Sequence, residues 1–161
     1  MRRTEREMTD AAVLAGILDR AAYANLAFLD CGAPAVIPVS FGYRIERGSF
    51  VFYFHSAGAG RKIECLKADA RVSFSAVGEN RIVIAEPACR STCHYESVIA
   101  AGRIEFITAA DGKRDALDCI MNHCGAPGSF EYPEPMLVRT AILRLVAETI
   151  SGKSNIPRSA V

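Results

Sequence analysis

The spacing of hydrophobic positions changes several times along the chain, and each change predicts a new element. Between residues 11 and 22 the apolar positions recur every three or four residues, which favours a helix that begins after Thr9 or Asp10. The residues that follow alternate or form short apolar runs, as β-strands do. Strands are predicted at 25–31, 36–45, 49–55, 71–77, 97–107 and 137–150, and two further helices at about 63–67 and 110–124.

Single residues refine this picture. Pro38 cannot donate a ladder hydrogen bond, so its strand is expected at an edge or at a bulge. Gly102 predicts a bulge or a close approach within a long strand. Residues 49–55 are apolar enough for a strand buried on both faces. About six antiparallel strands and three short helices therefore predict a single α+β domain, mainly β and barrel-like, rather than a doubly wound sheet.

Composition narrows the class of protein. The chain has 161 residues, half of them hydrophobic, which suits one domain with a full core. Its net charge of +1 gives no reason to expect nucleic acid or a membrane surface as partner. No apolar run reaches the ~18 residues of a membrane span, and no signal peptide is recognisable, so a cytoplasmic protein with six reduced cysteines is expected.

The segment 56–62, Ser-Ala-Gly-Ala-Gly-Arg-Lys, combines the groups that an anion site needs. Ser56 offers a hydroxyl, Arg61 a bidentate guanidinium and Lys62 a point charge. The two glycines let the backbone approach an anion, and the helix that follows adds its positive end. A solvated basic turn that only starts a helix would have the same sequence, and the pattern alone leaves both interpretations open.

Three histidines and six cysteines raise the question of other chemistry. His55 ends the most apolar strand next to the basic turn, where it is either a proton donor or a satisfied structural histidine. Two clusters, 89–94 and 119–124, each hold two cysteines and a histidine, but their spacing is not that of a common zinc site, so no metal is predicted. A redox role for Cys89 or Cys93 stays a minor alternative.

Residues 50–75 carry a resemblance to a known family. The run Phe-Val-Phe-Tyr-Phe-His-Ser-Ala-Gly-Ala-Gly-Arg-Lys, its short helix and the following strand are similar to the centre of the pyridoxamine 5′-phosphate oxidase-like superfamily. The nitroimidazole-resistance flavoproteins are the branch that the chain resembles most. Four other stretches fit that branch: 3–7, 37–43, 95–102 and 150–153. An Arg-rich second substrate-phosphate motif near the C-terminus, as in the oxidase itself, is not recognisable.

The resemblance implies an FMN-binding split β-barrel that works as a homodimer, with FMN in a cleft at the subunit interface. Position by position, it places the FMN phosphate on the basic turn, the flavin ring against the segments around residues 38–41 and 54–55, and one further contact on the strand at 97. The implied cofactor-binding residues are Pro38, Val39, Ser40, Phe41, Phe54, His55, Ser56, Arg61, Lys62 and Ser97.

An FMN-dependent oxidoreductase that acts on a small molecule is the leading functional hypothesis, with nitroimidazole-like and other nitroaromatic compounds as candidate substrates. His55 is the candidate catalytic residue. The alternative is a binding protein that holds flavin or haem without catalysis, with His55, His94 or His123 as a candidate iron ligand. A structural or regulatory protein without a chromophore is the third possibility.

Overall fold

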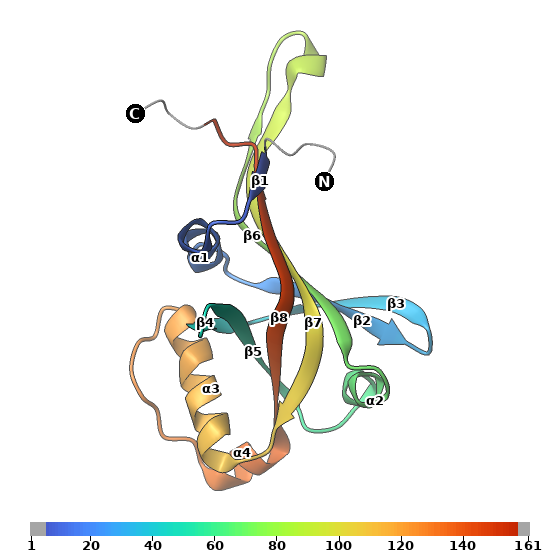
Figure 1. The fold of residues 1–161 in the computed structure, drawn as a ribbon, viewed down its shortest axis with the longest axis vertical. Coiled ribbons are helices and arrows are strands. Elements are labelled where there is room, and N and C mark those ends of the chain that lie inside the picture. The colour runs from blue at the N-terminus through green and yellow to red at the C-terminus, as the bar shows by residue number, and fades with distance from the viewer. Residues whose placement is uncertain (1–5, 158–161) are drawn as a thin grey trace.

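Eight strands form one antiparallel sheet in the computed structural model, which describes residues 6–157 (Figure 1). Along the path of the sheet the order is β3-β2-β6-β7-β8-β5-β4, and β1 pairs with β8 outside this path. The sheet is the predicted split barrel, with two strands more than the sequence indicated. The strands are β1 Glu7–Met8, β2 Ala24–Asp30, β3 Ala33–Val39, β4 Gly42–Glu46, β5 Ser49–Ala57, β6 Arg71–Val83, β7 Thr92–Ile107 and β8 Thr140–Ser154.

One predicted strand, 36–45, is in fact two. The chain leaves β3 at one edge of the sheet and enters β4 at the other, with only Ser40 and Phe41 between them. The two edges are therefore close to each other, and the sheet curls into a barrel that stays open between β3 and β4. Pro38 lies on the edge strand β3, as its missing N–H required.

Four α-helices cover parts of the sheet (Figure 1): α1 Ala11–Asp19, α2 Arg61–Ala68, α3 Ala110–His123 and α4 Glu134–Arg139. The Asp10 side chain caps α1 by accepting from the Val13 N–H. Helix α4 was not predicted: the Gly/Pro-rich composition of residues 125–135 indicates a loop, and residues 137–139 belong to the last predicted strand. Pro135 stands in the first turn of α4, where a proline is tolerated. Within residues 6–157, no helix is both long and apolar enough to cross a membrane.

The barrel interior is filled by aromatic rings. Phe52 stacks on Phe74 with ring centroids 4.3 Å apart, and Phe41 meets Phe74 edge-on at 5.3 Å. On the other face of β5, Val51 and Tyr53 pack against α3. Strand β5 is therefore buried on both faces, as its apolar run predicted, and the basic turn that follows it starts from a rigid support.

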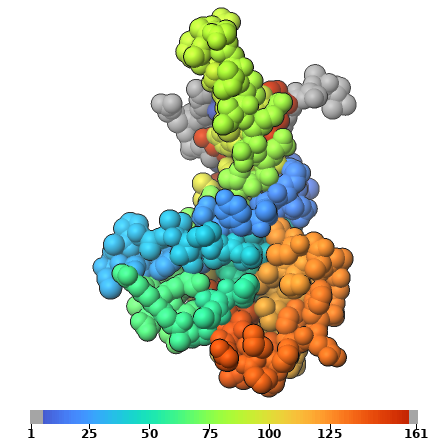
Figure 2. Space-filling view, turned by 180° about the vertical axis from the view of Figure 1, so that it is seen from behind, coloured from blue at the N-terminus to red at the C-terminus, as the bar shows by residue number. Residues whose placement is uncertain are grey.

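Strands β6 and β7 continue beyond the barrel as a two-stranded arm that stands clear of the rest (Figures 1 and 2). Residues 78–93, whose sequence pattern predicts no regular element, form this arm with a short 3-10 turn at Ala88–Arg90. A register shift in β6 at residues 77–79 marks its base. The register also shifts at Gly102, where the extra residue is Glu148 in β8, and a Cβ at Gly102 would lie 2.5 Å from the Val146 carbonyl oxygen, which confirms the predicted close approach.

Candidate functional site

The basic turn connects the end of β5 to the start of α2, and its glycines are needed for different reasons. The Gly58 N–H donates to the Arg139 carbonyl at 2.8 Å, and a Cβ at Gly58 would lie 2.9 Å from that oxygen. Gly60 has a φ of 121°, a conformation that side chains rarely adopt, and its carbonyl accepts from the N–H groups of Ile63 and Glu64. The turn is thus fixed to α4 on one side and to α2 on the other.

Two adjacent cations at the start of α2 have different surroundings. Lys62 is half-buried, and burial is the only cause that acts on its pKa, which it lowers; no carboxylate within residues 6–157 pairs with it. Arg61 is largely exposed, and its Nε donates to Asp30 Oδ2 at 2.6 Å. A bound anion would therefore supply Lys62 with its counter-ion, whereas it would compete with Asp30 for Arg61.

The start of α2 leaves backbone donors open. Gly60 caps the helix without a side-chain hydrogen bond, so nothing but the turn's own backbone occupies the first N–H groups. Ser56, half-buried on β5, precedes the turn. A helix N-terminus, a hydroxyl and an unpaired ammonium around one turn can hold a phosphate monoester.

A cavity of about 590 Å³ lies beside the turn. One wall is the segment 55–59, and the other is formed by Met136 and the residues 138–140 of α4 and β8. His55 is exposed on this side, at the end of β5. The arrangement gives the turn an open space large enough for part of a small organic molecule, with an imidazole at its edge.

The segment before β4 is divided between surface and core. Pro38 and Ser40 are exposed and Val39 is half-buried. The side chains of Phe41 and Phe54 have no exposed surface and pack in the barrel core. At these two positions, therefore, only the backbone is available to a ligand outside the core.

Ser97 lies far from the basic turn within one chain. It is paired with Val77 and Lys153, whereas His55 shares its register row with Ile142 and, through β8, with Ile107. Ser97 and Ile107 are ten residue steps apart along β7, which at ~3.3 Å per step is roughly 30 Å. A single chain does not bring Ser97 and the turn together.

The histidines of the haem hypothesis have unequal surroundings. The ring of His123 packs 4.2 Å from that of Phe41, and its Nε2 lies 3.0 Å from the Ala21 carbonyl. His94 is half-buried on the arm, and His55 is exposed. Within residues 6–157, no group of three or more His, Cys, Asp or Glu side chains is placed to hold a metal ion.

Two contacts of the turn were missed by the sequence reasoning: Asp30 on Arg61 and the Arg139 carbonyl on Gly58. Asp30 closes β2 before a hairpin, and Arg139 ends a helix that the sequence did not reveal. No local signal connects either residue with the turn, because the contacts depend on how distant strands are ordered.

Comparison with known proteins gives consistent matches over nearly the whole chain. The family model described as pyridoxamine 5′-phosphate oxidase matches residues 10–154. Two solved structures share the fold at a TM-score of 0.80: a candidate 5-nitroimidazole antibiotic resistance protein from Bacteroides thetaiotaomicron, 28% identical, and an FAD- and heme-binding protein from Mycobacterium smegmatis, 25% identical. The alignments cover 91% of this chain and 85% of the first protein, and 96% and 77% for the second.

A third structure, the flavocytochrome Anf3 from Azotobacter vinelandii, is 23% identical with a TM-score of 0.80 and covers 100% of this chain and 74% of its own. At this identity the likeness shows the fold alone. No curated protein matches the sequence.

Proposed function

The chain belongs to the pyridoxamine 5′-phosphate oxidase family, and from this premise we propose that it is an FMN-binding oxidoreductase. The observation that carries the proposal is the turn at the start of α2. There, Lys62 is half-buried and has no carboxylate partner within residues 6–157, in the first turn of a helix whose N-cap, Gly60, makes no side-chain hydrogen bond. Partial burial of an unpaired cation carries a desolvation cost, and a bound phosphate offsets that cost. We assign the FMN phosphate to this turn.

We further propose a cytoplasmic homodimer with the cofactor between the subunits. The outer face of the sheet supports a second copy: two neighbouring register rows across β3, β2, β6, β7 and β8 carry no charged side chain. The rows are Val36, Ala27, Ser73, Ala101 and Thr149, and Pro38, Asn25, Ser75, Ile99 and Ser151. Val36 and Ile99 in these rows expose 63% and 53% of their surface, and a second copy that covers this face would bury both apolar residues.

The same surface bears on the cofactor. Pro38 lies in one of the uncharged rows, and Ser97 lies in the next row along the same face. If the partner covers this face, Ser97 of one chain can approach the turn of the other, which one chain alone does not allow. The ring contacts implied for Pro38, Val39, Ser40 and Ser97 therefore belong to the dimer hypothesis.

FMN, when bound, supplies the redox chemistry; the protein supplies binding, orientation and electrostatics. Lys62 and the helix N-terminus hold the phosphate, and the backbone at Phe41 and Phe54 positions the ring. His55 borders the cavity and can hold a proton close to a substrate there. Nitroaromatic compounds are the proposed substrates, because the 28% identical protein is a candidate 5-nitroimidazole antibiotic resistance protein.

A second candidate is a flavin- or haem-binding protein without catalysis. The likeness to the FAD- and heme-binding protein favours it, together with the exposed His55 beside a cavity. A Soret band after addition of hemin that disappears in His55→Ala supports this candidate, and an unchanged band in that variant removes His55 as the iron ligand.

The deciding experiment is an absorption spectrum of the purified protein before and after addition of FMN or FAD, followed by gel filtration. We expect flavin bands that elute with a dimer, and slow reduction of a nitroimidazole when a chemical reductant is added. If excess FMN leaves no flavin on the protein, the proposal fails. If flavin binds but no nitroaromatic is consumed, the substrate assignment alone fails.

A further inference from the structure

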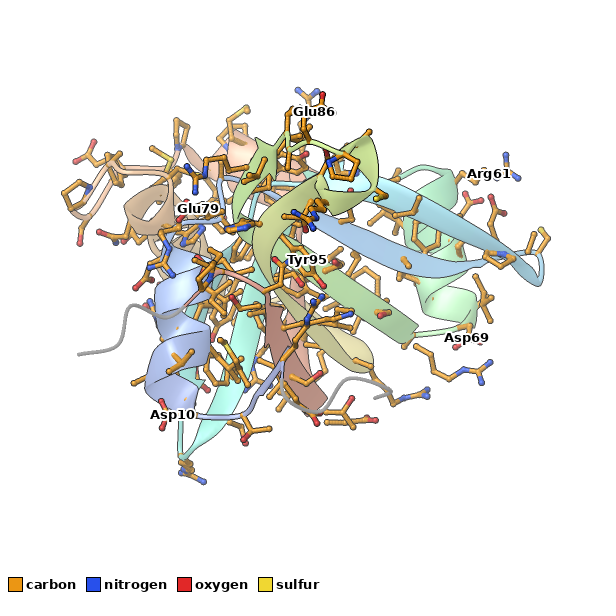
Figure 3. The ribbon with its side chains drawn as sticks, turned by 90° about the horizontal axis from the view of Figure 1, so that it is seen from above. Asp10, Arg61, Asp69, Glu79, Glu86 and Tyr95 are labelled. Atoms are coloured by element: carbon orange, nitrogen blue, oxygen red, sulfur yellow. The ribbon has the colours of Figure 1, made fainter. Side chains whose placement is uncertain are left out.

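A second cavity, of about 680 Å³, lies between α2 and the β2–β3 hairpin, away from His55. Cys31, at the exposed tip of the hairpin with a φ of 51°, and Cys65, half-buried on α2, both line it. Arg61 and Asp30 line the same cavity, and Figure 3 shows Arg61 beside the hairpin. Two thiols, a carboxylate and a cation of the proposed cofactor site thus share one open space.

The Asp30 carboxylate connects these groups. Its Oδ2 accepts from Arg61 at 2.6 Å and its Oδ1 accepts from the Cys65 thiol at 3.4 Å. Burial pushes the pKa of Asp30 upward, but the hydrogen bonds from Arg61 and Cys65 and the charge of Arg61 bring it below its ordinary value. Burial and Asp30 together raise the pKa of Cys65, which keeps this thiol protonated. The Asp30 carboxylate therefore contacts the Cys65 thiol directly, and Cys31, the next residue along the chain, lines the same cavity.

We propose that Cys31 and Cys65 are an oxidation site that a hydroperoxide converts to a disulfide, and that this change alters how Arg61 is shared between Asp30 and an anionic ligand. The second part rests on the proposed function; the first does not. A disulfide needs Cα atoms about 4.4–6.8 Å apart. Cys31 and Gly32 form the two-residue turn of the β2–β3 hairpin beyond the last ladder pair, Asp30 and Ala33, and Cys31 and Cys65 line one cavity.

The reaction balances in two steps. The exposed Cys31 thiolate attacks the hydroperoxide, an S–O bond forms, the O–O bond breaks, and the alcohol or water leaves, which gives a sulfenic acid. The Cys65 sulfur then attacks the Cys31 sulfur: the S–S bond forms, the S–O bond breaks, and water leaves with the proton of Cys65, for which Asp30 is the nearest acceptor. Two thiols are oxidised and one hydroperoxide is reduced.

The consequence for Arg61 follows from the donors of Asp30. In the reduced protein, the carboxylate is shared between Arg61 and the Cys65 thiol. The disulfide has no S–H, so Asp30 keeps Arg61 as its donor and holds the guanidinium more firmly. Arg61 is then less available to the phosphate of FMN, and we expect FMN affinity to fall by about fivefold or more, the lower end of ordinary coupling between linked sites.

The test uses the full chain, titrated with hydrogen peroxide, digested with trypsin without reduction, and analysed by mass spectrometry. We expect a crosslink between peptide 21–44, which holds Cys31, and peptide 63–67, which holds Cys65. Cys65→Ser keeps a donor for Asp30 but abolishes the crosslink. Cys93→Ser, on the exposed arm, is the matched control and retains it.

FMN affinity is then measured on reduced and oxidised protein. A crosslink with weaker FMN binding supports the proposal. Peroxide-treated protein in which Cys31 and Cys65 stay separate overturns it, and a crosslink with unchanged FMN affinity overturns the effect on Arg61. If the reduced protein binds no FMN at all, the proposed function fails while the peptide map still decides the oxidation site.

Discussion

Replacing Lys62 by methionine separates two effects of its half-buried ammonium. Methionine has a similar length and no charge, so the free protein loses a desolvated cation that has no carboxylate partner within residues 6–157. Removing such a charge should stabilise the free protein by about 1 kcal/mol, which for a chain of this size raises Tm by roughly 2–4 °C. The same change removes a charge-assisted contact to phosphate, worth about 1.5–3 kcal/mol, or roughly 10- to 150-fold in Kd.

The assay is a pair of titrations: FMN binding by quenching of flavin fluorescence, and thermal unfolding with and without FMN. Lys67→Met, on the same helix but exposed, is the control and should leave FMN affinity within about twofold. The lowered pKa of Lys62 makes the folded chain bind fewer protons than the unfolded one. The stability of the wild type should therefore rise with pH between that lowered value and 10.5, a rise that Lys62→Met removes.

The reasoning is refuted if Lys62→Met binds FMN as the wild type does, or if the variant loses both FMN affinity and stability. In the first case the phosphate lies elsewhere. In the second case Lys62 supports the fold, and its effect on binding is indirect. The proposed role of Lys62 requires that Lys62→Met raises the stability of the free protein and lowers its FMN affinity.

Three further predictions concern the fold. Gly42→Ala would place a Cβ 2.6 Å from the backbone of α3 and should destabilise the protein by about 1–3 kcal/mol. Gly16→Ala, whose Cβ would meet nothing closer than 3.6 Å, should leave the stability unchanged or increase it. Thermal unfolding compares the two variants, and equal Tm values would contradict the prediction. Arg20→Ala leaves the buried Glu96 carboxylate without its 2.6 Å partner and should cost about 1–3 kcal/mol in urea unfolding, most of which Glu96→Gln in the same chain restores. A side-chain hydrogen bond from Arg71 lowers the pKa of Asp69 to about 2. The Asp69 carboxylate therefore stabilises the fold above pH 3.8, and this contribution is lost as the pH falls toward about 2. The urea unfolding midpoints of the wild type and of Asp69→Asn should converge at that low pH.

The strands with a strong local pattern were predictable. The apolar run at 49–55 forms β5, and Gly102 marks a close approach to the backbone of β8, because burial and the absence of a side chain are local properties of these residues. The break at Ser40–Phe41 was not visible, since both flanking segments have strand character and only the curl of the sheet separates them. Helix α4 was not predicted because Pro135 and its neighbours have the composition of a loop, and only tertiary contacts make them helical.

In the candidate site, too, the features set by local sequence were predictable and those set by tertiary contacts were not. The turn at 56–62 could be found from its residue types, because serine, glycines and cations in one short segment are typical of an anion-binding site. The pairing of Arg61 with Asp30 depends on the β2–β3 hairpin lying over α2, which no pattern near either residue indicates. The contacts implied for Ser97 stay a prediction, and they require a second chain that brings distant parts of two sheets together.

The position of β8 has a consequence for how the protein is made. β8 is the last strand of the described chain, yet it alone joins the side of the sheet that ends in β3 to the side that ends in β4, through its pairing with β7 and β5. Until β8 pairs, β5 has no neighbouring strand other than β4, and the two sides of the sheet are not joined. The sheet is therefore completed by pairings between distant parts of the chain, which form more slowly than local hairpins and leave strand edges open to aggregation in the meantime.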